Sequence, residues 1–315
     1  MSTVLYLVVP CYNEEETLPT TEKALSELMS DMIKRGRISE NSRIVFVNDG
    51  SKDKTWELIE KYTNENTLIK GIKLSRNKGH QNALLAGLMT VKDECDCAVS
   101  LDADLQDDIG AVEKMLDEFE DGCEIVYGVR SKREKDTLFK RATAQGFYKF
   151  MRFMGADVIY DHADYRLMSR RALHELENFK EVNLFLRGIV PMIGFKTGTV
   201  MYERGVREYG ESKYPLKKML SFAVDGITSL SIKPIRFITT LGILLLFASI
   251  IMLAYSLVRH FTGHTELGWT SLIVSIWGIG GLQLFAIGVV GEYIGKIYLE
   301  TKERPRFIID KYIGK

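Results

Sequence analysis

Apolar runs alternate with helical patterns along roughly the first 130 residues of the chain. Between the runs, apolar residues recur at helical spacing, as Leu18, Leu25, Leu28 and Met32 do. The runs themselves predict strands at 4–10, 43–51, 68–75, 95–104 and 123–130. Strands that alternate with helices predict βα units and a mainly parallel, Rossmann-like sheet, so the expected fold class is α/β.

Two charge-free stretches follow in the last third of the chain. Residues 237–258 (22 residues) lie between two arginines, and residues 267–291 (25 residues) lie between two glutamates. A helix rises ~1.5 Å per residue, so each stretch is long enough to cross a ~30 Å hydrocarbon core. Because the connection between them is too short to be a domain, we expect a two-helix transmembrane hairpin.

Basic residues flank this hairpin on its two outer sides. Lys233 and Arg236 precede it and six lysines and arginines follow it, whereas the connecting loop offers only Arg259 and two histidines. The positive-inside rule then puts both chain ends in the cytoplasm. We expect a multi-pass protein of the inner (plasma) membrane whose large N-terminal domain is cytoplasmic.

These patterns divide the chain into four parts. The segment 214–235 combines apolar positions with Lys217, Lys218 and Lys233, which is typical of a helix in the membrane interface. The region 130–152 carries eight basic residues against two acidic ones. It is either a solvated helix face or a surface that faces anionic headgroups. The expected parts are a cytoplasmic domain at 1–213, the amphipathic segment at 214–235, the hairpin at 236–295 and a basic tail at 296–315.

Composition adds little to this division. The 42 basic and 42 acidic residues cancel, so bulk charge favours no particular partner and does not indicate nucleic-acid binding. Four cysteines show neither a CxxC pair nor zinc-ligand spacing, which is typical of reduced cytosolic thiols. The N-terminal apolar run has no basic region before it and predicts a strand rather than a signal peptide.

Polar residues gather where the predicted strands end. In a parallel α/β sheet the ligand lies beyond the carboxyl ends of the strands, so these residues predict a shared pocket. The chain has neither GxGxxG nor GxxxxGK[ST], and therefore no dinucleotide or P-loop site is indicated. The polar ends are Pro10–Glu14, Asn48–Asp53, Ser75–Gly79 and Asp102–Asp104.

Two of these residues, Asp102 and Asp104, are candidates for metal binding. They are two positions apart, so in an extended chain they point to one side. Carboxylate oxygens and substrate phosphates are the ligands that Mg²⁺ takes. A divalent ion held here would neutralise a diphosphate and make it a better leaving group.

Several motifs resemble those of a known family. The stretches "VVPCYNEEETL", "VNDGSKDKT", "SRNKGHQNALLAGL" and "SLDADLQDD" resemble the signature blocks of family-2 glycosyltransferases with the GT-A fold. Three later stretches, "HADYRLMSRRAL", "RGVREYGESKYPLKKM" and "VVGEYIGKIYLETKERPRFII", resemble the polyprenyl-phosphate glycosyltransferases. That group includes bactoprenol glucosyltransferases and, more distantly, dolichol-phosphate mannose synthase. One departure is Asp107-Asp108, where those enzymes often have proline, and we do not expect it to affect catalysis.

The resemblance implies a role for each matching position. Asp164, in "HADYRL", matches the catalytic carboxylate proposed for the family, and Arg130 would approach the sugar or diphosphate. Arg207, Ser212 and Lys213 would form a loop over the phosphates, to which lysine and arginine give charged donors. The implied nucleotide-sugar site comprises Pro10, Tyr12, Glu14, Asp49, Asn77, Gly79, Asp102, Ala103 and Arg130. The implied ligands of Mg²⁺ or Mn²⁺ are Asp102, Asp104 and Gln106.

The resemblance also implies an inverting reaction with a lipid phosphate as acceptor. A phosphate monoester has a second pKa of about 6, so near neutral pH it needs no strong general base. We expect Asp164 chiefly to orient the acceptor or to stabilise oxocarbenium-like charge, with a plain salt bridge to Arg166 or Arg170 as the alternative. His80, beside Gly79, is interpreted as a neighbour of a helix N-cap.

The function expected from these features is transfer of a hexose from a UDP-sugar to undecaprenyl or another polyprenyl phosphate, for modification of a cell-envelope glycan. UDP-glucose is the donor that the resemblance favours, with UDP-N-acetylglucosamine and UDP-galactose open. Two spans are too few for a translocation pathway, so a separate flippase is expected downstream. Gly291 and Gly295 could seat a contact within the hairpin or in a homo-oligomer. The alternatives are a membrane glycosyltransferase with a hydroxyl acceptor and a non-catalytic membrane scaffold.

Overall fold

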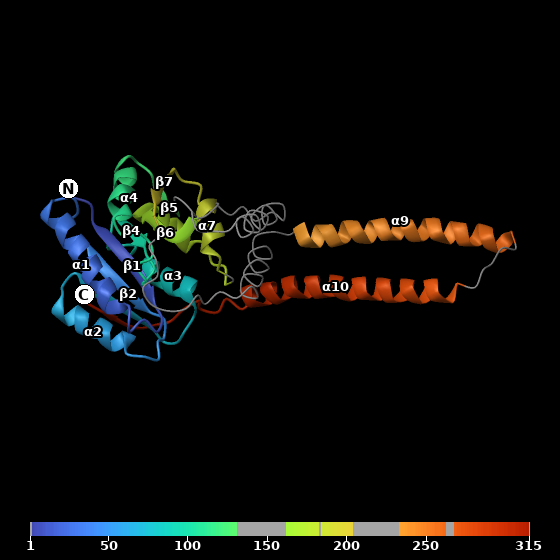
Figure 1. Cartoon of the computed structure of the whole chain (residues 1–315), viewed down its shortest axis with the longest axis horizontal. Coiled ribbons are helices and arrows are strands. Elements are labelled where there is room, and N and C mark those ends of the chain that lie inside the picture. Colours follow the sequence, from blue (N-terminus) through green and yellow to red (C-terminus); the bar gives the residue numbers. More distant parts are fainter. Residues whose placement is uncertain (1, 131–161, 183, 204–232, 263–267, 315) are drawn as a thin grey trace. The chain divides into compact units, whose positions relative to one another are not determined.

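The computed structural model describes residues 2–130, 162–182, 184–203, 233–262 and 268–314 (Figure 1). The described residues fall into two units. One comprises the described residues up to 203 together with 304–314, and the other comprises 233–262 and 268–303. Most of the basic region 130–152, the loop with Arg207, Ser212 and Lys213, and most of the expected interfacial segment lie outside the described residues.

The first unit contains an eight-stranded sheet, counted over the described residues, in the order β7-β5-β6-β4-β1-β2-β3-β8. The strands β1 to β4 pair in parallel, as do β5 and β7, while β6 and β8 run antiparallel to their neighbours. This confirms the α/β class with a mainly parallel sheet. The bounds are β1 Leu5–Cys11, β2 Arg43–Asn48, β3 Ile69–Leu74, β4 Cys97–Ser100, β5 Ile125–Arg130, β6 His162–Ser169, β7 Thr197–Tyr202 and β8 Ile309–Ile313.

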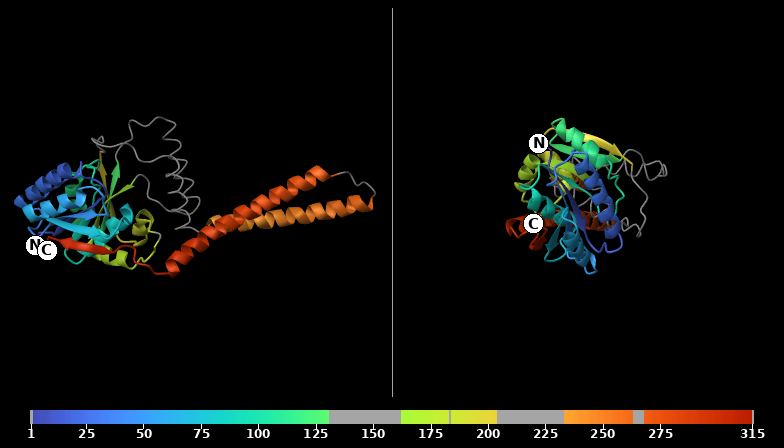
Figure 2. Two further views of the ribbon diagram at one scale, coloured as in Figure 1. Left: turned by 90° about the horizontal axis from the view of Figure 1, so that it is seen from below. Right: turned by 90° about the vertical axis from the view of Figure 1, so that its left-hand side faces the viewer.

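Helices cover both faces of this sheet (Figure 2). Buried residues of α1 (Leu18–Lys34), α2 (Thr55–Glu65) and α4 (Ala111–Glu120) form one hydrophobic cluster with the strands. Those of α3 (His80–Val91), α6 (Arg170–Glu177) and α7 (Leu186–Met192) form a second cluster on the opposite face. Both faces of the parallel strands are therefore buried, which is why these strands read as continuous apolar runs rather than as alternating ones.

The four cysteines are free and buried in these clusters. Burial raises the pKa of the Cys95 thiol to about 12, so the reactive thiolate form is suppressed. This agrees with the interpretation of the cysteines as reduced thiols without a metal-binding pattern.

The end of the chain adds β8 to the sheet. The sequence analysis expected a basic tail at 296–315, but Ile309–Ile313 pairs antiparallel with β3, and Ile313 packs against the hydrophobic cluster. Tyr312 donates its hydroxyl hydrogen to Glu94, 3.1 Å away, beside the buried Lys70. The sheet thus contains strands that precede the two long apolar helices in the sequence and one strand, β8, that follows them.

The second unit consists of two long helices, α9 (Lys233–Phe261) and α10 (Trp269–Thr301), which run antiparallel and contact each other (Figure 1). Among the residues that the structure describes, one helical segment is long and apolar enough to cross a membrane. It is Gly278–Thr301, with a mean hydropathy of 1.3, and it extends beyond Gly291, where the sequence analysis ended the second span. The transmembrane hairpin with spans at 237–258 and 267–291 stays a prediction.

We expect Ile313→Ala to destabilise the first unit because Ile313 lies against the bare backbone of Gly71, whose added Cβ would be 3.0 Å from the Ile313 side chain. Ile313 is partly buried, so the expected loss is about 1–2 kcal/mol, below that of a fully buried isoleucine. Thermal unfolding of the full chain in detergent measures it. Ile309→Ala, on the same strand but 37% exposed, is the matched control. Equal destabilisation by the two variants would show that β8 is not packed as described.

Candidate active site at the carboxyl ends of the strands

The loops that follow β1 and β2 are locked together by hydrogen bonds. The Asn13 backbone N–H donates to Ser51 Oγ (3.0 Å), and the Lys52 N–H donates back to Asn13 Oδ1 (2.9 Å). Asn13 has a left-handed backbone (φ 53°), which asparagine tolerates better than most residues. The Glu14 N–H donates to Thr55 Oγ1 (2.9 Å). The backbone that carries Tyr12, 41% exposed, and Glu14 is therefore fixed from the neighbouring loop.

Asp49 is buried between the loops after β2 and β3. Its two carboxylate oxygens accept hydrogen bonds from the backbone N–H groups of Lys78 (2.7 Å) and Gly79 (2.9 Å). Burial raises the pKa of Asp49, and these two donors only partly oppose the rise. Gly50 permits this approach, because a Cβ on it would lie 2.5 Å from the backbone nitrogen of Asn77. The geometry thus brings Asp49, Asn77 and Gly79 together.

The loop after β4 carries Asp102, Ala103 and Asp104 and is held in place from α1. The buried Thr21 hydroxyl donates to the Ala103 carbonyl oxygen over 2.6 Å. Asp104 Oδ1 accepts from the Gln106 backbone N–H (3.2 Å), and Leu105 between them has a left-handed backbone (φ 49°). A non-glycine residue in that conformation is strained, and such strain is often found at functional sites.

The carboxylate oxygens of Asp102 and Asp104 have the chemistry of ligands for a divalent ion that is also bound by a substrate. Within the described residues no group of three or more His, Cys, Asp and Glu side chains could hold a metal alone. Mg²⁺ commonly uses one or two carboxylates together with substrate phosphates. The chemistry of Asp102 and Asp104 fits that requirement, and the assignment of Asp102, Asp104 and Gln106 as metal ligands stays a prediction.

Asp164 lies on β6 between two guanidinium groups. Arg166 Nη2 is 2.7 Å from Asp164 Oδ1, and Arg187 donates from Nε (3.3 Å) and Nη2 (3.2 Å) to the two carboxylate oxygens. Burial would raise the pKa of Asp164, but Arg187 and Arg166 outweigh it and hold the pKa well below the usual carboxyl range. The alternative partner Arg170 pairs with Asp96 instead.

His80 lies close to both Asp102 and Asp164. Its Nε2 atom is 3.5 Å from Asp102 Oδ1 and 3.9 Å from Asp164 Oδ2. The imidazole therefore faces both the loop after β4 and the carboxylate of Asp164. Desolvation by the surrounding protein and the negative charge of Asp164 raise the pKa of Asp102, and His80 opposes this rise. The two aspartates thus differ in charge environment, because both lie near His80 but Asp164 is also contacted by Arg166 and Arg187.

The structure therefore gathers most of the expected residues along one edge of the sheet. Arg130 ends β5 and donates to Tyr202, while Pro10 is the second-last residue of β1. The sequence analysis did not assign Arg187 or Tyr202, and it interpreted His80 as a neighbour of the N-cap. His80 is indeed the first residue of α3, after the N-cap Gly79. Its place directly after the polar segment Ser75–Gly79, between β3 and α3, was the signal for a role at the site.

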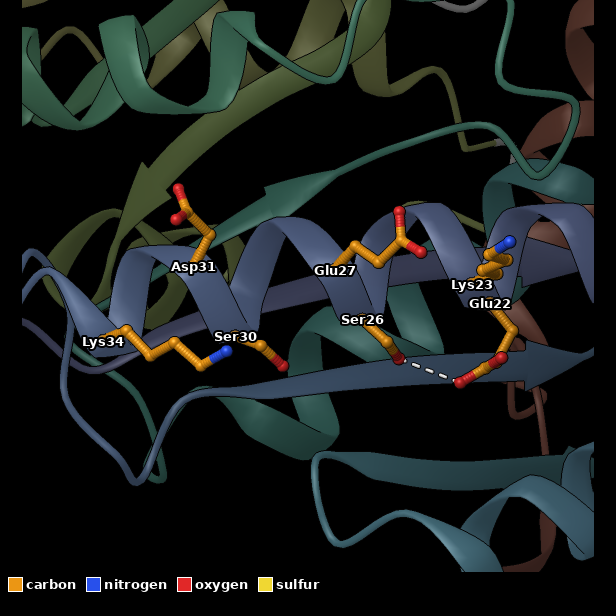
Figure 3. A pocket seen from close by; sticks show the side chains of 7 residues that line it. All are labelled: Glu22, Lys23, Ser26, Glu27, Ser30, Asp31 and Lys34. Carbon is orange, nitrogen blue, oxygen red and sulfur yellow. Dashed lines mark hydrogen bonds between the residues drawn. The ribbon is translucent and has the colours of Figure 1, made fainter.

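A separate surface depression lies on α1 (Figure 3). Its volume is about 350 Å³. Its lining comes from this one helix, and it contains a hydrogen bond of 2.9 Å from Ser26 to Glu22. None of the strand-end residues lines it, so it does not belong to the candidate site. The lining residues are Glu22, Lys23, Ser26, Glu27, Ser30, Asp31 and Lys34.

The model of the family "Glycosyl transferase family 2" matches residues 6–177. The chain belongs to glycosyltransferase family 2. The loops after β1 to β4, described above, fall inside the matched range.

Relatives of this glycosyltransferase extend over nearly the whole chain. It is 54% identical over 307 residues to the "Uncharacterized glycosyltransferase YkoT" of Bacillus subtilis, covering 98% of this chain and 91% of the relative. It is 38% identical over 305 residues to the "Bactoprenol glucosyl transferase" of Shigella phage SfX, covering 96% and 97%. It is 37% identical over 307 residues to the "Prophage bactoprenol glucosyl transferase homolog" of Escherichia coli, covering 97% and 98%.

We expect Arg187→Gln to raise the pKa of Asp164, because Arg187 supplies two of its N–H donors and one of its two guanidinium charges. A carboxylate whose pKa rises is protonated at higher pH, so the acid limb of the pH–rate profile of the glycosyltransferase should move upward. We also expect turnover to fall about a hundredfold, because Asp164 is no longer held from that side.

The matched control is Arg170→Gln, which removes an arginine next to β6 that pairs with Asp96 and not with Asp164. It should leave the profile unchanged. An acid limb that stays in place in Arg187→Gln, or moves equally in both variants, would contradict the assignment.

Proposed function

We propose that this protein transfers glucose from UDP-glucose to a polyprenyl phosphate, undecaprenyl phosphate in a bacterium, with inversion at the anomeric carbon. The observation that carries the proposal is the similarity, over 96–97% of the chain, to proteins named bactoprenol glucosyl transferase. The polar loops at the carboxyl ends of the strands support it, because they present buried and half-buried groups suited to a nucleotide diphosphate.

The donor would bind across the loops after β1, β2 and β4. Tyr12 and Glu14 are held in place by the second loop, and Asp49 is fixed by two backbone N–H groups, so this part of the pocket is formed before the ligand arrives. A preformed site loses little conformational entropy on binding. In this assignment the base and ribose lie against these residues, and the diphosphate points toward Asp102 and Asp104.

Asp102 and Asp104 would hold Mg²⁺ or Mn²⁺ against the diphosphate. The ion, when bound, neutralises the charge that develops on the departing nucleoside diphosphate. The protein contributes the fixed loop, which Thr21 holds through the Ala103 carbonyl.

Asp164 is a poor candidate for a general base. The most effective catalytic base has a pKa near the working pH, whereas the pKa of Asp164 is held far lower by Arg187 and Arg166. A polyprenyl phosphate needs no base, because near neutral pH it is largely a dianion. We therefore assign Asp164 to stabilising the positive charge that develops on the sugar ring, or to orienting the groups around it. A hydroxyl acceptor would require the base that this environment disfavours.

A membrane location suits this acceptor. Gly278–Thr301 has the length and hydropathy of a spanning helix, and a polyprenyl tail is soluble only in lipid. We propose that α9 and α10 form the hairpin, that residues 214–235 lie in the interface, and that transfer takes place at the cytoplasmic face. The product would then need a separate flippase.

The decisive experiment is a mass-spectrometric product assay on the full chain in detergent. It contains undecaprenyl phosphate, Mg²⁺ or Mn²⁺, and a panel of UDP- and GDP-sugars. We expect a metal-dependent lipid-phosphate-hexose from UDP-glucose. Asp104→Ala should lower its yield at least about a hundredfold, because the metal loses a carboxylate ligand. Asp108→Asn, which changes an exposed carboxylate of the same loop, is the control and should retain activity. Product from no donor, with UDP still bound, would refute the lipid-phosphate acceptor.

A second prediction concerns Asp164→Asn. If Asp164 does not remove a proton, the variant should be slower than the wild type by a similar factor from about pH 6 to pH 8, across the second pKa of the acceptor phosphate. Initial rates at saturating donor measure this ratio. Recovery toward the wild-type rate as the pH rises would instead assign proton removal to Asp164.

A further inference from the structure

Tyr202, at the end of β7, contacts two residues of the site. Its side-chain hydroxyl donates to Asp107 Oδ1 over 2.6 Å and accepts from Arg130 Nε over 3.3 Å. Arg130 is the direct register partner of Tyr202 in the parallel pair of β5 and β7. The Arg130 Nη2 atom also lies 3.6 Å from the same Asp107 oxygen. The three side chains form a closed triangle of one phenol, one carboxylate and one guanidinium.

Two members of this triangle are buried. Tyr202 is 3% exposed and Asp107 is 5% exposed, whereas the Arg130 side chain is 26% exposed. A buried carboxylate that loses its donor bears the full cost of desolvation, so the Tyr202–Asp107 hydrogen bond is strongly favoured. The buried Tyr202–Asp107 pair is thus fixed in place, and the more exposed Arg130 packs against it.

A second tyrosine, Tyr165, also contacts the Tyr202–Asp107 pair and the backbone beside it. The rings of Tyr165 and Tyr202 meet edge to face, with centroids 5.1 Å apart. The Tyr165 hydroxyl donates to the Asp108 carbonyl oxygen over 2.9 Å, so the backbone directly after Asp107 is also held. Because Tyr165 follows Asp164 on β6, the triangle is anchored on the strand that carries the proposed catalytic carboxylate.

We propose that Tyr202 and Asp107 are positioning residues for the donor, which hold the Arg130 guanidinium in the orientation that meets the diphosphate or sugar. This inference rests on the proposed function, in which Arg130 approaches that part of the nucleotide sugar. It adds two residues that touch no substrate and act through Arg130. The Asp107 position, where the resemblance suggested only a harmless departure, thereby gains a role.

The test removes one hydroxyl. Binding of UDP in the presence of Mn²⁺ is measured by titration calorimetry on the full chain in detergent, separately from any transfer to lipid. Tyr202→Phe removes the hydroxyl that accepts from Arg130 Nε. It should weaken UDP binding about tenfold, the loss of roughly one hydrogen bond to a charged group. Tyr6→Phe is the matched control, because Tyr6 is also a buried tyrosine that donates to a carboxylate, Glu94, over 3.2 Å. It should change the affinity less than about twofold.

A double-mutant cycle separates positioning from general loosening. In an Arg130→Ala background the Tyr202→Phe change should cost less than about twofold, because the group that it positions is gone. A merely structural tyrosine would cost the same in both backgrounds, and that additivity, or equal effects of Tyr202→Phe and Tyr6→Phe, would overturn the inference.

The same measurements distinguish this inference from the proposed function. Coupling between Tyr202 and Arg130 without a lipid-linked product supports the inference and refutes the lipid-phosphate acceptor. A lipid-linked product without coupling between Tyr202 and Arg130 would support the lipid-phosphate acceptor and overturn the inference. Failure of the wild-type protein to bind UDP would overturn both.

Discussion

The parallel pairing of β2, β1 and β4 is the constraint on which the site depends. Parallel strands bring their carboxyl ends to one edge, and the chain must leave each strand there by a loop. Neighbouring loops of this kind carry polar backbone groups that the sheet no longer pairs. In this protein the loops satisfy one another, since Asn13 and Ser51 join the first two and Asp49 joins the second to the third. Hydrogen bonds between neighbouring loops therefore hold this edge of the sheet together.

The carboxylates at this edge of the sheet differ in the groups that contact them. Asp49 is held by backbone N–H groups, which carry no net charge, and burial raises its pKa. Asp164 is held by guanidinium groups, and its pKa is lowered. Asp102 lies 3.5 Å from the His80 imidazole, and its side chain is 41% exposed. The three carboxylates at this edge of the sheet thus differ in the charge of the groups that contact them.

Much of this arrangement could be predicted from the sequence because it is local. Apolar runs followed by polar residues located β1 to β4 and the loops that carry Asp49 and Asp102. Of the two arginines that contact Asp164, the nearby Arg166 could be named from the sequence, but Arg187 could not. Arg187 lies 23 residues further along, on a short helix, and only packing brings it near. Tyr202 lies even further from Asp107, 95 residues along the chain. Strand β8 has just five residues, three of them polar or aromatic. Pairing at such separations leaves no periodic signal in the chain.

The position of β8 has a consequence for how this protein is made. A ribosome synthesises the chain from its N-terminus, so β1 to β7 and then both long helices emerge before the strand that pairs with β3. Until then the outer edge of β3 has unpaired N–H and C=O groups, a state that proteins normally protect against aggregation. The catalytic sheet is consequently the first part of the molecule to begin folding and the last to finish. A messenger broken after the codon for Thr301 would yield a protein with both apolar helices but with an unfinished sheet, a defect that cellular quality control can recognise.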